Sequence, residues 1–409
     1  MIELKKSCLN KLSGIEVLLP SSKSISNRLL VIQSLAVLQN EIENLSKSND
    51  TVLLKKVLMD ENSFYFNFED AGTPYRFFTS IAALKYPSFI LDAHEGLKKR
   101  PIKGLVNALK QLGAEISYLE EEGFPPIKIE KTIDLSSTHL QLEVSLSSQF
   151  LSSLLLISPL FDDGLTLSFN QQMVSKPYVD MTISVMRNYG ITVEEQENAI
   201  MVKKGEYKML QPYTVEADWS SAAFLFGFLS LSESHEMLFP SLSLNSSQGD
   251  RAIVAIFEKF GVFCTETENG LRVQKQKNVI PDYLEVDFTD IPDAFPLVLA
   301  FCVAHQVNAV FTGIKNLKFK ESDRVSAMID NLLPLGLRVL EHSEDLIRID
   351  SSLIKTLETY HFKSFNDHRI AMACSLFVLK GNIVIDNERV VNKSFPDYWQ
   401  VLETIGIRE

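Results

Sequence analysis

The chain has 409 residues, which is too long for one compact core, so we expect two or three domains. A hydrophobic content of 45% and a charged content of 22% are ordinary for a soluble globular protein. The net charge of -12 argues against bulk binding of nucleic acid, which favours a basic surface.

The cysteines and the apolar segments indicate the cellular compartment of the protein. Cys8, Cys264, Cys302 and Cys374 are scattered without metal-ligand spacing, which indicates reduced thiols. The N-terminal "MIELKKSCLN" lacks the apolar stretch of a signal peptide. The run "AFPLVLAFCVA" is shorter than the roughly 18 residues needed to span a membrane. We therefore expect a soluble, cytoplasmic protein that does not enter a membrane.

The first predicted helix begins in "PSSKSISNRLL", where polar residues precede the apolar "LLVIQSLAVL". Lys23, Ser24 and Arg28 lie within its first two turns. An ammonium, a guanidinium and a hydroxyl together suit a phosphate or carboxylate. Taken alone, the stretch is explained at least as well by a capped helix with two solvated cations.

A second apolar helix is predicted in "AGTPYRFFTSIAAL". Thr73 is the expected N-cap and Pro74 the first helical residue. Gly72 would let a ligand approach the backbone closely. Capping does not explain Arg76, which needs an anion or solvent near the start of a buried helix.

The third apolar helix follows "SLSSQF", from Ser145. Ser147, Ser148 and Gln149 could cradle a phosphate or simply cap the helix, and the sequence does not decide between these interpretations.

Three more stretches of this kind occur in the second half: "EADWSSAAFLFGFLSL", "DIPDAFPLVLAFCVA" and "FNDHRIAMACSLFVL". Asp293 lies at the start of the second of these stretches. The helix dipole favours a carboxylate there, and the alternative is that Asp293 transfers a proton among the cations. Arg369 follows His368 directly into an apolar run, where an unpaired cation is costly. The segment "KFKESDR" places Lys320, Glu321 and Arg324 at the head of an amphipathic helix, and such charge runs are usually solvated.

An amphipathic pattern alternates with these apolar helices. Five amphipathic helices end at glycines about 70 to 77 residues apart, which suits glycine's easy left-handed conformation: Gly113, Gly190, Gly261, Gly336 and Gly406. A sixth copy without glycine begins at Ser48. Strands are predicted in "GLTLSF", "AIMVKK", "NAVFTG" and "NIVIDN". Six units of one buried helix, one amphipathic helix and several strands indicate an α/β (α+β) protein built from repeats.

The cations gather at predicted helix heads. Helix N-termini carry unpaired N–H groups and partial positive charge, so several aimed at one space form an anion site. Together these cations suit a small ligand with several negative charges. They are Lys23, Arg28, Arg76, Arg100, Arg324, Arg369 and Lys393.

These stretches closely resemble the 5-enolpyruvylshikimate-3-phosphate synthase family of enolpyruvyl transferases. The matching segments run in family order from residue 22 to residue 399: "SKSISNR", "DAGTPYRF", "RPIKGLVNALKQLGA", "SSQF", "VSKPYVD", "IPDA", "KESDR", "NDHR" and "NKSFPDYW".

The resemblance implies transfer of the enolpyruvyl group of phosphoenolpyruvate to the 5-hydroxyl of shikimate 3-phosphate, with release of phosphate. It implies no metal or other cofactor, no nucleic-acid partner, and a monomer. It also implies two domains of three βαβαββ-type repeats, 18–216 and 1–17 plus 217–409. The buried helices would direct their N-termini at an active site in the cleft between the domains.

The resemblance also implies roles for single residues. Asp293 and Glu321 would carry protons, with Lys23 assisting. Phosphoenolpyruvate would be bound by Lys23, Gly72, Arg100, Gln149, Arg324, Arg369 and Lys393. Shikimate 3-phosphate would be bound by Lys23, Ser24, Arg28, Ser147, Ser148, Gln149, Ser175, Tyr178, Asp293, Asn316 and Lys320. Arg76 would have a supporting role.

Three positions depart from the family pattern: Ser22 stands where glycine is common, Asp70 where asparagine is usual, and Phe77 where proline is frequent. A carboxylate at Asp70 would weaken anion binding unless it turns away.

Two alternatives stay open. The related UDP-N-acetylglucosamine enolpyruvyl transferase carries a reactive cysteine in a loop that corresponds to "LDAHEGLKKRPI", which has none. A non-catalytic relative that binds a phosphorylated metabolite would not need both Asp293 and Glu321 beside the full set of cations.

Overall fold

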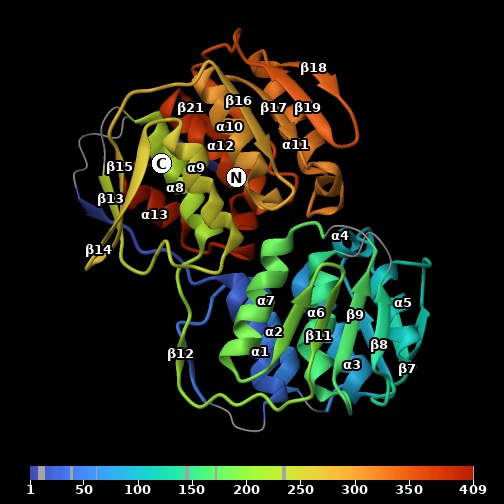
Figure 1. Ribbon diagram of the computed structural model, residues 1–409. Coiled ribbons are helices and arrows are strands. Elements are labelled where there is room, and N and C mark those ends of the chain that lie inside the picture. The colour runs from blue at the N-terminus through green and yellow to red at the C-terminus, as the bar shows by residue number, and fades with distance from the viewer. Residues whose placement is uncertain are drawn as a thin grey trace. The chain divides into compact units, whose positions relative to one another are not determined.

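The computed structural model describes residues 1–7, 14–36, 40–60, 62–142, 147–170, 173–232 and 236–408. Cys8 and the first residues of the stretch from Ser145 lie outside these ranges. The chain divides into two compact units, an N-terminal unit (Ser22–Val215) and a C-terminal unit (Met1–Ser21 with Glu216–Glu409) (Figure 1). Each unit has a hydrophobic core of its own.

Three buried helices form the centre of the N-terminal unit: α1 (Lys23–Leu35), α3 (Gly72–Lys85) and α6 (Ser148–Ile157). They contact one another because their side chains are apolar on most faces. The other helices of this unit are α2 (Asn49–Met59), α4 (Glu95–Lys98), α5 (Lys103–Gln111), α7 (Lys176–Asn188) and the 3₁₀ turn η1 (Ser158–Leu160).

Two four-stranded sheets of this unit share one topology. The first has the order β4 (Tyr65–Asn67), β5 (Phe89–Asp92), β7 (Ile127–Lys131) and β6 (Glu115–Tyr118). The second has the order β8 (His139–Leu142), β9 (Leu165–Phe169), β11 (Ala199–Val202) and β10 (Val193–Gln196). In both, the first two strands are parallel and the other pairings antiparallel.

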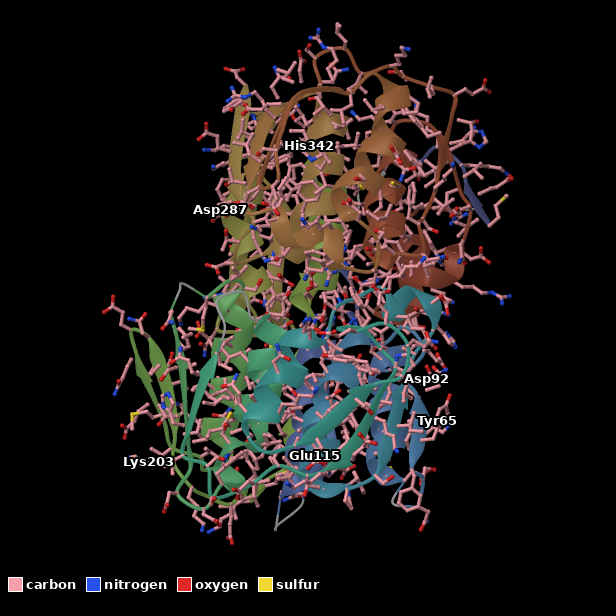
Figure 2. The ribbon with its side chains drawn as sticks, turned by 90° about the vertical axis from the view of Figure 1, so that its right-hand side faces the viewer. Tyr65, Asp92, Glu115, Lys203, Asp287 and His342 are labelled. Carbon is pink, nitrogen blue, oxygen red and sulfur yellow. The ribbon has the colours of Figure 1, made fainter. Side chains whose placement is uncertain are left out.

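Side-chain and short-strand contacts complete this unit. The hydroxyl of Tyr65 on β4 donates to the Asp92 carboxylate on β5 at 2.8 Å (Figure 2). A shorter parallel pair joins β3 (Ile42–Glu43) to β12 (Tyr213–Thr214).

The C-terminal unit also has three buried helices: α8 (Trp219–Leu231), α10 (Phe295–His305) and α12 (His368–Ser375). Its other helices are α9 (Ile253–Glu258), α11 (Arg324–Leu332) and α13 (Tyr398–Thr404). The 3₁₀ turns are η2 (Gly249–Ala252), η3 (Pro292–Ala294), η4 (Lys315–Phe319), η5 (Leu333–Leu335), η6 (Leu376–Leu379) and η7 (Glu388–Lys393).

The sheets of the C-terminal unit repeat the same directions. One has the order β2 (Ile15–Glu16), β13 (Glu236–Phe239), β15 (Gly270–Lys275) and β14 (Val262–Thr267). Another has the order β16 (Tyr283–Asp287), β17 (Asn308–Thr312), β19 (Leu346–Asp350) and β18 (Arg338–His342). The third joins β20 (Thr359–Phe362), β21 (Asn382–Ile385) and β1 (Ile2–Leu4).

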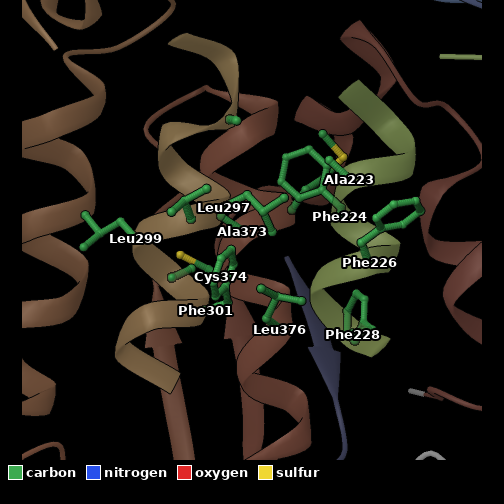
Figure 3. Packing of buried hydrophobic residues seen from close by; sticks show 14 of the residues in the cluster. Ala223, Phe224, Phe226, Phe228, Leu297, Leu299, Phe301, Ala373, Cys374 and Leu376 are labelled. Atoms are coloured by element: carbon green, nitrogen blue, oxygen red, sulfur yellow. The ribbon is translucent and has the colours of Figure 1, made fainter. Parts of the chain in front are cut away.

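The core of the C-terminal unit lies where its three buried helices meet. Phe224, Phe228, Leu297, Phe301 and Leu376 are fully buried there (Figure 3). Large apolar side chains of this kind each contribute about 1.5 to 3 kcal/mol when they are buried. The helices are therefore fixed by packing.

The predicted glycine terminators are confirmed. The five glycines at the ends of the amphipathic helices all have positive φ, between 77° and 103°. At Gly336 a Cβ atom would also lie 2.6 Å from the carbonyl oxygen of Leu353, so a larger residue meets both strain and a clash. The four strands predicted by name are confirmed as β9, β11, β17 and β21.

Within the described residues, no helix has both the length and the apolar character needed to cross a membrane.

Candidate active site

The head of α1 places Lys23 beside a carboxylate. Ser22 caps the helix, since its side chain accepts a hydrogen bond from the backbone N–H of Ile25. Nζ of Lys23 lies 3.3 Å from Oδ2 of Asp50 on α2. Sequence reasoning did not identify Asp50, because an acidic residue in the first turn of a helix is common and is stabilised by the helix dipole.

Arg28 is buried among neutral hydrogen-bond acceptors. Its guanidinium donates to the Thr182 hydroxyl at 2.7 Å, to the Ser24 carbonyl at 2.8 Å and to the Tyr178 carbonyl at 2.9 Å. Burial lowers the pKa of Arg28 to about 10, and no carboxylate of the described residues forms an ion pair with it. A buried cation that lacks a counter-charge in the protein suits an anionic ligand.

Gly72 separates two guanidinium groups at the start of α3. A Cβ atom on Gly72 would lie 2.8 Å from Nη1 of both Arg76 and Arg100, so a larger residue would force these guanidinium groups to shift. Arg76 and Arg100 are buried, and Arg76 donates to Oε1 of Gln149 at 2.7 Å. This hydrogen bond connects the head of α3 to the head of α6.

The expected capping role of Thr73 is wrong. Helix α3 begins at Gly72, Ala71 occupies the N-cap position, and no side chain caps the helix. The preceding Glu69 has a left-handed φ of 52°, which turns the chain so that the helix starts earlier. The first-turn N–H groups of α3 therefore receive no side-chain cap.

The heads of α6 and α7 contribute hydroxyl groups. Ser147 caps α6 by accepting from the backbone N–H of Gln149 at 3.3 Å, and Ser148 is the first helical residue. Ser175 precedes α7 with a left-handed φ of 57°, which costs about 1 to 3 kcal/mol in a residue other than glycine. Tyr178 in the first turn of α7 bonds Arg28 through its carbonyl oxygen.

In the C-terminal unit, Asp293 lies among three cations. Its carboxylate is 2.7 Å from Nη1 of Arg324, 3.0 Å from Nη2 of Arg369 and 3.3 Å from Nζ of Lys320. Burial would raise the pKa of Asp293, but Arg369, Lys320 and Arg324 hold it well below its ordinary value. Asp293 lies in η3, one residue before the N-cap Ala294, and does not cap α10.

Arg324 connects this cluster. Besides Asp293, it binds Oε2 of Glu321 at 2.8 Å and Oδ2 of Asp367 at 2.8 Å. Burial would lower the pKa of Arg324, but Asp367, Glu321 and Asp293 raise it above its ordinary value. The interpretation of this charge run as solvated is therefore wrong for Arg324, whose side chain is 1% exposed, and holds for the exposed Lys318 and Asp323.

Glu321 also faces Lys393, whose Nζ lies 3.7 Å from Oε1. The loop before α12 brings Arg369 to this cluster through two consecutive left-handed residues, Phe365 and Asn366. Strained backbone of this kind collects at functional sites. Asn316 does not join the cluster, since it is exposed on η4 and its side chain forms no hydrogen bond within the described residues.

Sequence reasoning missed a further buried carboxylate, Asp250 in η2. It accepts a hydrogen bond from the Ser220 hydroxyl at the head of α8. Burial and the charge of Asp293 raise the pKa of Asp250 to about 6, against the opposing effect of Arg369. Its only sequence signal was a Gly-Asp pair before an amphipathic helix.

The structure thus forms two clusters, each within one unit. The N-terminal cluster comprises three contact groups at helix heads: Lys23 with Asp50, Arg28 with Tyr178 and Thr182, and Gly72 with Arg76, Arg100 and Gln149. Ser147 and Ser148 begin α6, and Ser175 precedes α7. The C-terminal cluster joins Asp250, Asp293, Lys320, Glu321, Arg324, Asp367, Arg369 and Lys393. Both combine helix heads with several cations, and the second adds carboxylates that can accept or donate protons.

Comparison with known structures identifies the class. The fold is that of the enolpyruvyl transferases. EPSP synthase from Acinetobacter baumannii superposes with a TM-score of 0.76 at 20% identity, covering 99% of this chain and 98% of that one. The enolpyruvyl transferase NikO from Streptomyces tendae superposes with a TM-score of 0.71 at 14% identity, covering 99% and 97%.

Sequence comparison narrows the class to one family. The family model EPSP synthase (3-phosphoshikimate 1-carboxyvinyltransferase) matches residues 55–402. The chain is 35% identical to the 3-phosphoshikimate 1-carboxyvinyltransferase of Bacteroides fragilis, over 95% of this chain and 94% of that protein. It is 32% identical to the protein of the same name from Mannheimia haemolytica, over the full length of both. The chain belongs to the EPSP synthase family.

Proposed function

We propose that the chain transfers the enolpyruvyl group of phosphoenolpyruvate to the 5-hydroxyl of shikimate 3-phosphate and releases phosphate. Family membership supports this reaction over transfer to UDP-N-acetylglucosamine. The observation that carries the proposal is the C-terminal cluster, where Asp293 and Glu321 bind the same buried guanidinium at 2.7 and 2.8 Å.

Cations and helix heads of both clusters hold the two anionic substrates. Phosphoenolpyruvate is bound by Lys23, Gly72, Arg100, Gln149, Arg324, Arg369 and Lys393. Shikimate 3-phosphate is bound by Lys23, Ser24, Arg28, Ser147, Ser148, Gln149, Ser175, Tyr178, Asp293, Asn316 and Lys320. The proposed reaction requires residues of both clusters to contact the same pair of substrates. The counter-charge for buried Arg28 is then the phosphorylated substrate.

The reaction is an addition followed by an elimination. The 5-hydroxyl oxygen bonds to C2 of phosphoenolpyruvate, its proton leaves to a base, and the methylene carbon C3 gains a proton. The methyl group of the tetrahedral adduct then loses a proton as the C2–O bond to phosphate breaks. Atoms and charge balance without any further reactant.

The geometry suggests how the proton carriers divide this work. Asp293 is held as a carboxylate by three cations, so it can accept a hydrogen bond from the 5-hydroxyl, while the same cations lower its strength as a base. We assign it the hydroxyl proton. Glu321 then carries the proton to and from the methylene carbon. Lys23 assists at the phosphate and the hydroxyl, because an ammonium can donate to both.

One assay tests the proposal. Phosphate release from phosphoenolpyruvate is measured with shikimate 3-phosphate as acceptor, and in parallel with UDP-N-acetylglucosamine. We expect release with the first acceptor only. Release with UDP-N-acetylglucosamine alone would assign the chain to the other reaction, and release with neither by well-folded protein would mean a binding protein.

A further inference from the structure

The ammonium group of Lys23 depends on one acidic neighbour. Nζ of Lys23 lies 3.3 Å from Oδ2 of Asp50, and the two side chains are 16% and 6% exposed. Within the described residues, no other carboxylate lies within ion-pair distance of Lys23. Lys23 is the first residue of α1, and Asp50 belongs to the first turn of α2.

The local field opposes a positive charge on Lys23. The N-terminus of α1 carries partial positive charge, and the guanidinium of Arg28 is buried one turn further along the same helix. Asp50 is favoured where it lies, because the start of α2 stabilises a carboxylate. Among the described residues, Asp50 is therefore the acidic side chain that faces the ammonium group of Lys23.

A buried polar network fixes the head of α2 against α1. The hydroxyl of Thr51 donates to Oδ1 of Asn27 at 2.9 Å, and the N–H of Ser46 donates to the Ser26 hydroxyl at 3.0 Å. The Ser48 side chain caps α2 and contacts the Thr51 hydroxyl at 3.1 Å. All five side chains are at most 4% exposed.

This polar network fixes the orientation of α2 and does not maximise the free energy of unfolding. Burying hydroxyl and amide groups carries a desolvation cost, and Nδ2 of Asn27 has no hydrogen-bond partner within the described residues. Apolar packing would hold the two helices together without that cost. Directional hydrogen bonds instead fix the rotation of α2, which aims Asp50 at Lys23.

We propose that Asp50 is a positioning residue for the reaction, which holds the ammonium group of Lys23 in place and directs it toward the anionic substrates. The inference rests on the proposed function, in which Lys23 contacts both substrates. Asp50 itself touches neither substrate and acts through Lys23.

The first test reads the coupling of Asp50 to Lys23 without any turnover. The dissociation constant for shikimate 3-phosphate is measured by calorimetry in Asp50→Asn, in Lys23→Met and in the double variant. Asp50→Asn should weaken binding by roughly tenfold when Lys23 is present and should have no further effect in Lys23→Met. An effect of equal size in both backgrounds would overturn the proposal.

The second test uses turnover of shikimate 3-phosphate with phosphoenolpyruvate. Asp50→Asn should lower kcat by roughly 10- to 100-fold, whereas Asp50→Glu should recover most of the activity. A loss without recovery in Asp50→Glu would mean a merely structural role and contradict the proposal.

The matched control is Glu115→Gln, which removes the acidic partner of another lysine of the same unit. Glu115 lies 3.5 Å from Lys131, and both side chains are more than 60% exposed (Figure 2). It should change neither readout. If the wild-type protein turns over neither acceptor, the proposed function fails, and the calorimetric comparison still decides whether Asp50 acts through Lys23.

Discussion

Arg324 organises the C-terminal cluster through its three carboxylate partners, Asp293, Glu321 and Asp367. A fully buried guanidinium is costly to desolvate, and this cost is offset only when charged partners surround it. Because Arg324 binds Asp293 and Glu321 through different nitrogens, it fixes their separation. The two proposed proton carriers are thus parts of one ion network.

Substitution of Glu321 distinguishes a role in proton transfer from a role in binding shikimate 3-phosphate. Glu321→Gln keeps the size of the side chain and a hydrogen bond to Arg324 but cannot carry a proton, so kcat should fall by at least about 100-fold. The dissociation constant for shikimate 3-phosphate, measured by calorimetry, should stay within a few-fold of wild type. Glu344→Gln, an exposed acid paired with Lys318, is the control and should behave as wild type. Loss of shikimate 3-phosphate binding in Glu321→Gln would contradict the assigned role.

The buried carboxyl of Asp250 predicts a pH-dependent stability. Its pKa is raised from 3.8 to about 6, so the folded chain holds a proton there that the unfolded chain releases near pH 4. The free energy of unfolding therefore falls as pH rises through this window, by up to about 3 kcal/mol. In Asp250→Asn this contribution is absent.

Urea unfolding of wild type and Asp250→Asn at pH 4, 5, 6 and 7 checks this prediction. The only two tryptophans, Trp219 and Trp399, belong to the C-terminal unit, so fluorescence follows the unit that contains Asp250. The stability of the variant relative to wild type should rise with pH across the series. A difference that does not depend on pH would show that Asp250 is ionised throughout.

At the scale of elements, apolar composition was enough to predict the six buried helices. The apolar runs that form α8 and α10 leave these helices without a polar face, so burial is their only stable environment. The ends were harder to predict, because they depend on backbone turns. The apolar run after Arg369 divides into α12 and η6, and α3 begins before Thr73 because Glu69 is left-handed.

The close approach of the three helices in the C-terminal core predicts an overpacking effect. Gly227 lies in α8, and a Cβ atom there would be 2.9 Å from Cδ1 of Leu297 and 3.1 Å from Cδ2 of Leu376. Gly227→Val should therefore destabilise the C-terminal unit by about 1 to 3 kcal/mol, despite the better helix propensity of most residues over glycine. Tryptophan fluorescence in urea measures this change. Equal or greater stability would mean that the helices move apart without cost.

The whole molecule consists of two units with separate cores, and one of them is continuous in sequence. Ser22–Val215 contains its own sheets and buried helices. We expect a fragment of residues 22–215 to fold alone, with helical circular dichroism and a cooperative thermal transition. A fragment without cooperative unfolding would show that this unit needs the rest of the chain.

The C-terminal unit should not tolerate loss of the first residues. Strand β1 pairs with β21, where Ile2 lies opposite Ile385, and β2 pairs with β13. Sequence periodicity alone does not predict such pairing, because strands joined from distant parts of the chain leave no local signal. The carboxylates Asp50 and Asp250 were missed for the same reason, since their partners Lys23 and Asp293 are distant in sequence or on another element.

The residues that sequence motifs singled out are mostly those that the fold gathers into clusters, because cations at buried helix heads cannot be explained by local structure. Arg76, Arg324 and Arg369 are buried in this way. Asn316 is the exception, since nothing in its exposed setting on η4 distinguishes it from a surface residue.

The central claim is that these clusters perform enolpyruvyl transfer to shikimate 3-phosphate. The most direct measurement is phosphate release from phosphoenolpyruvate by the purified protein, with and without shikimate 3-phosphate, together with identification of the product by mass spectrometry. We predict release that depends on shikimate 3-phosphate, with one enolpyruvyl adduct formed for each phosphate. Folded protein that binds both substrates but releases no phosphate would contradict the account.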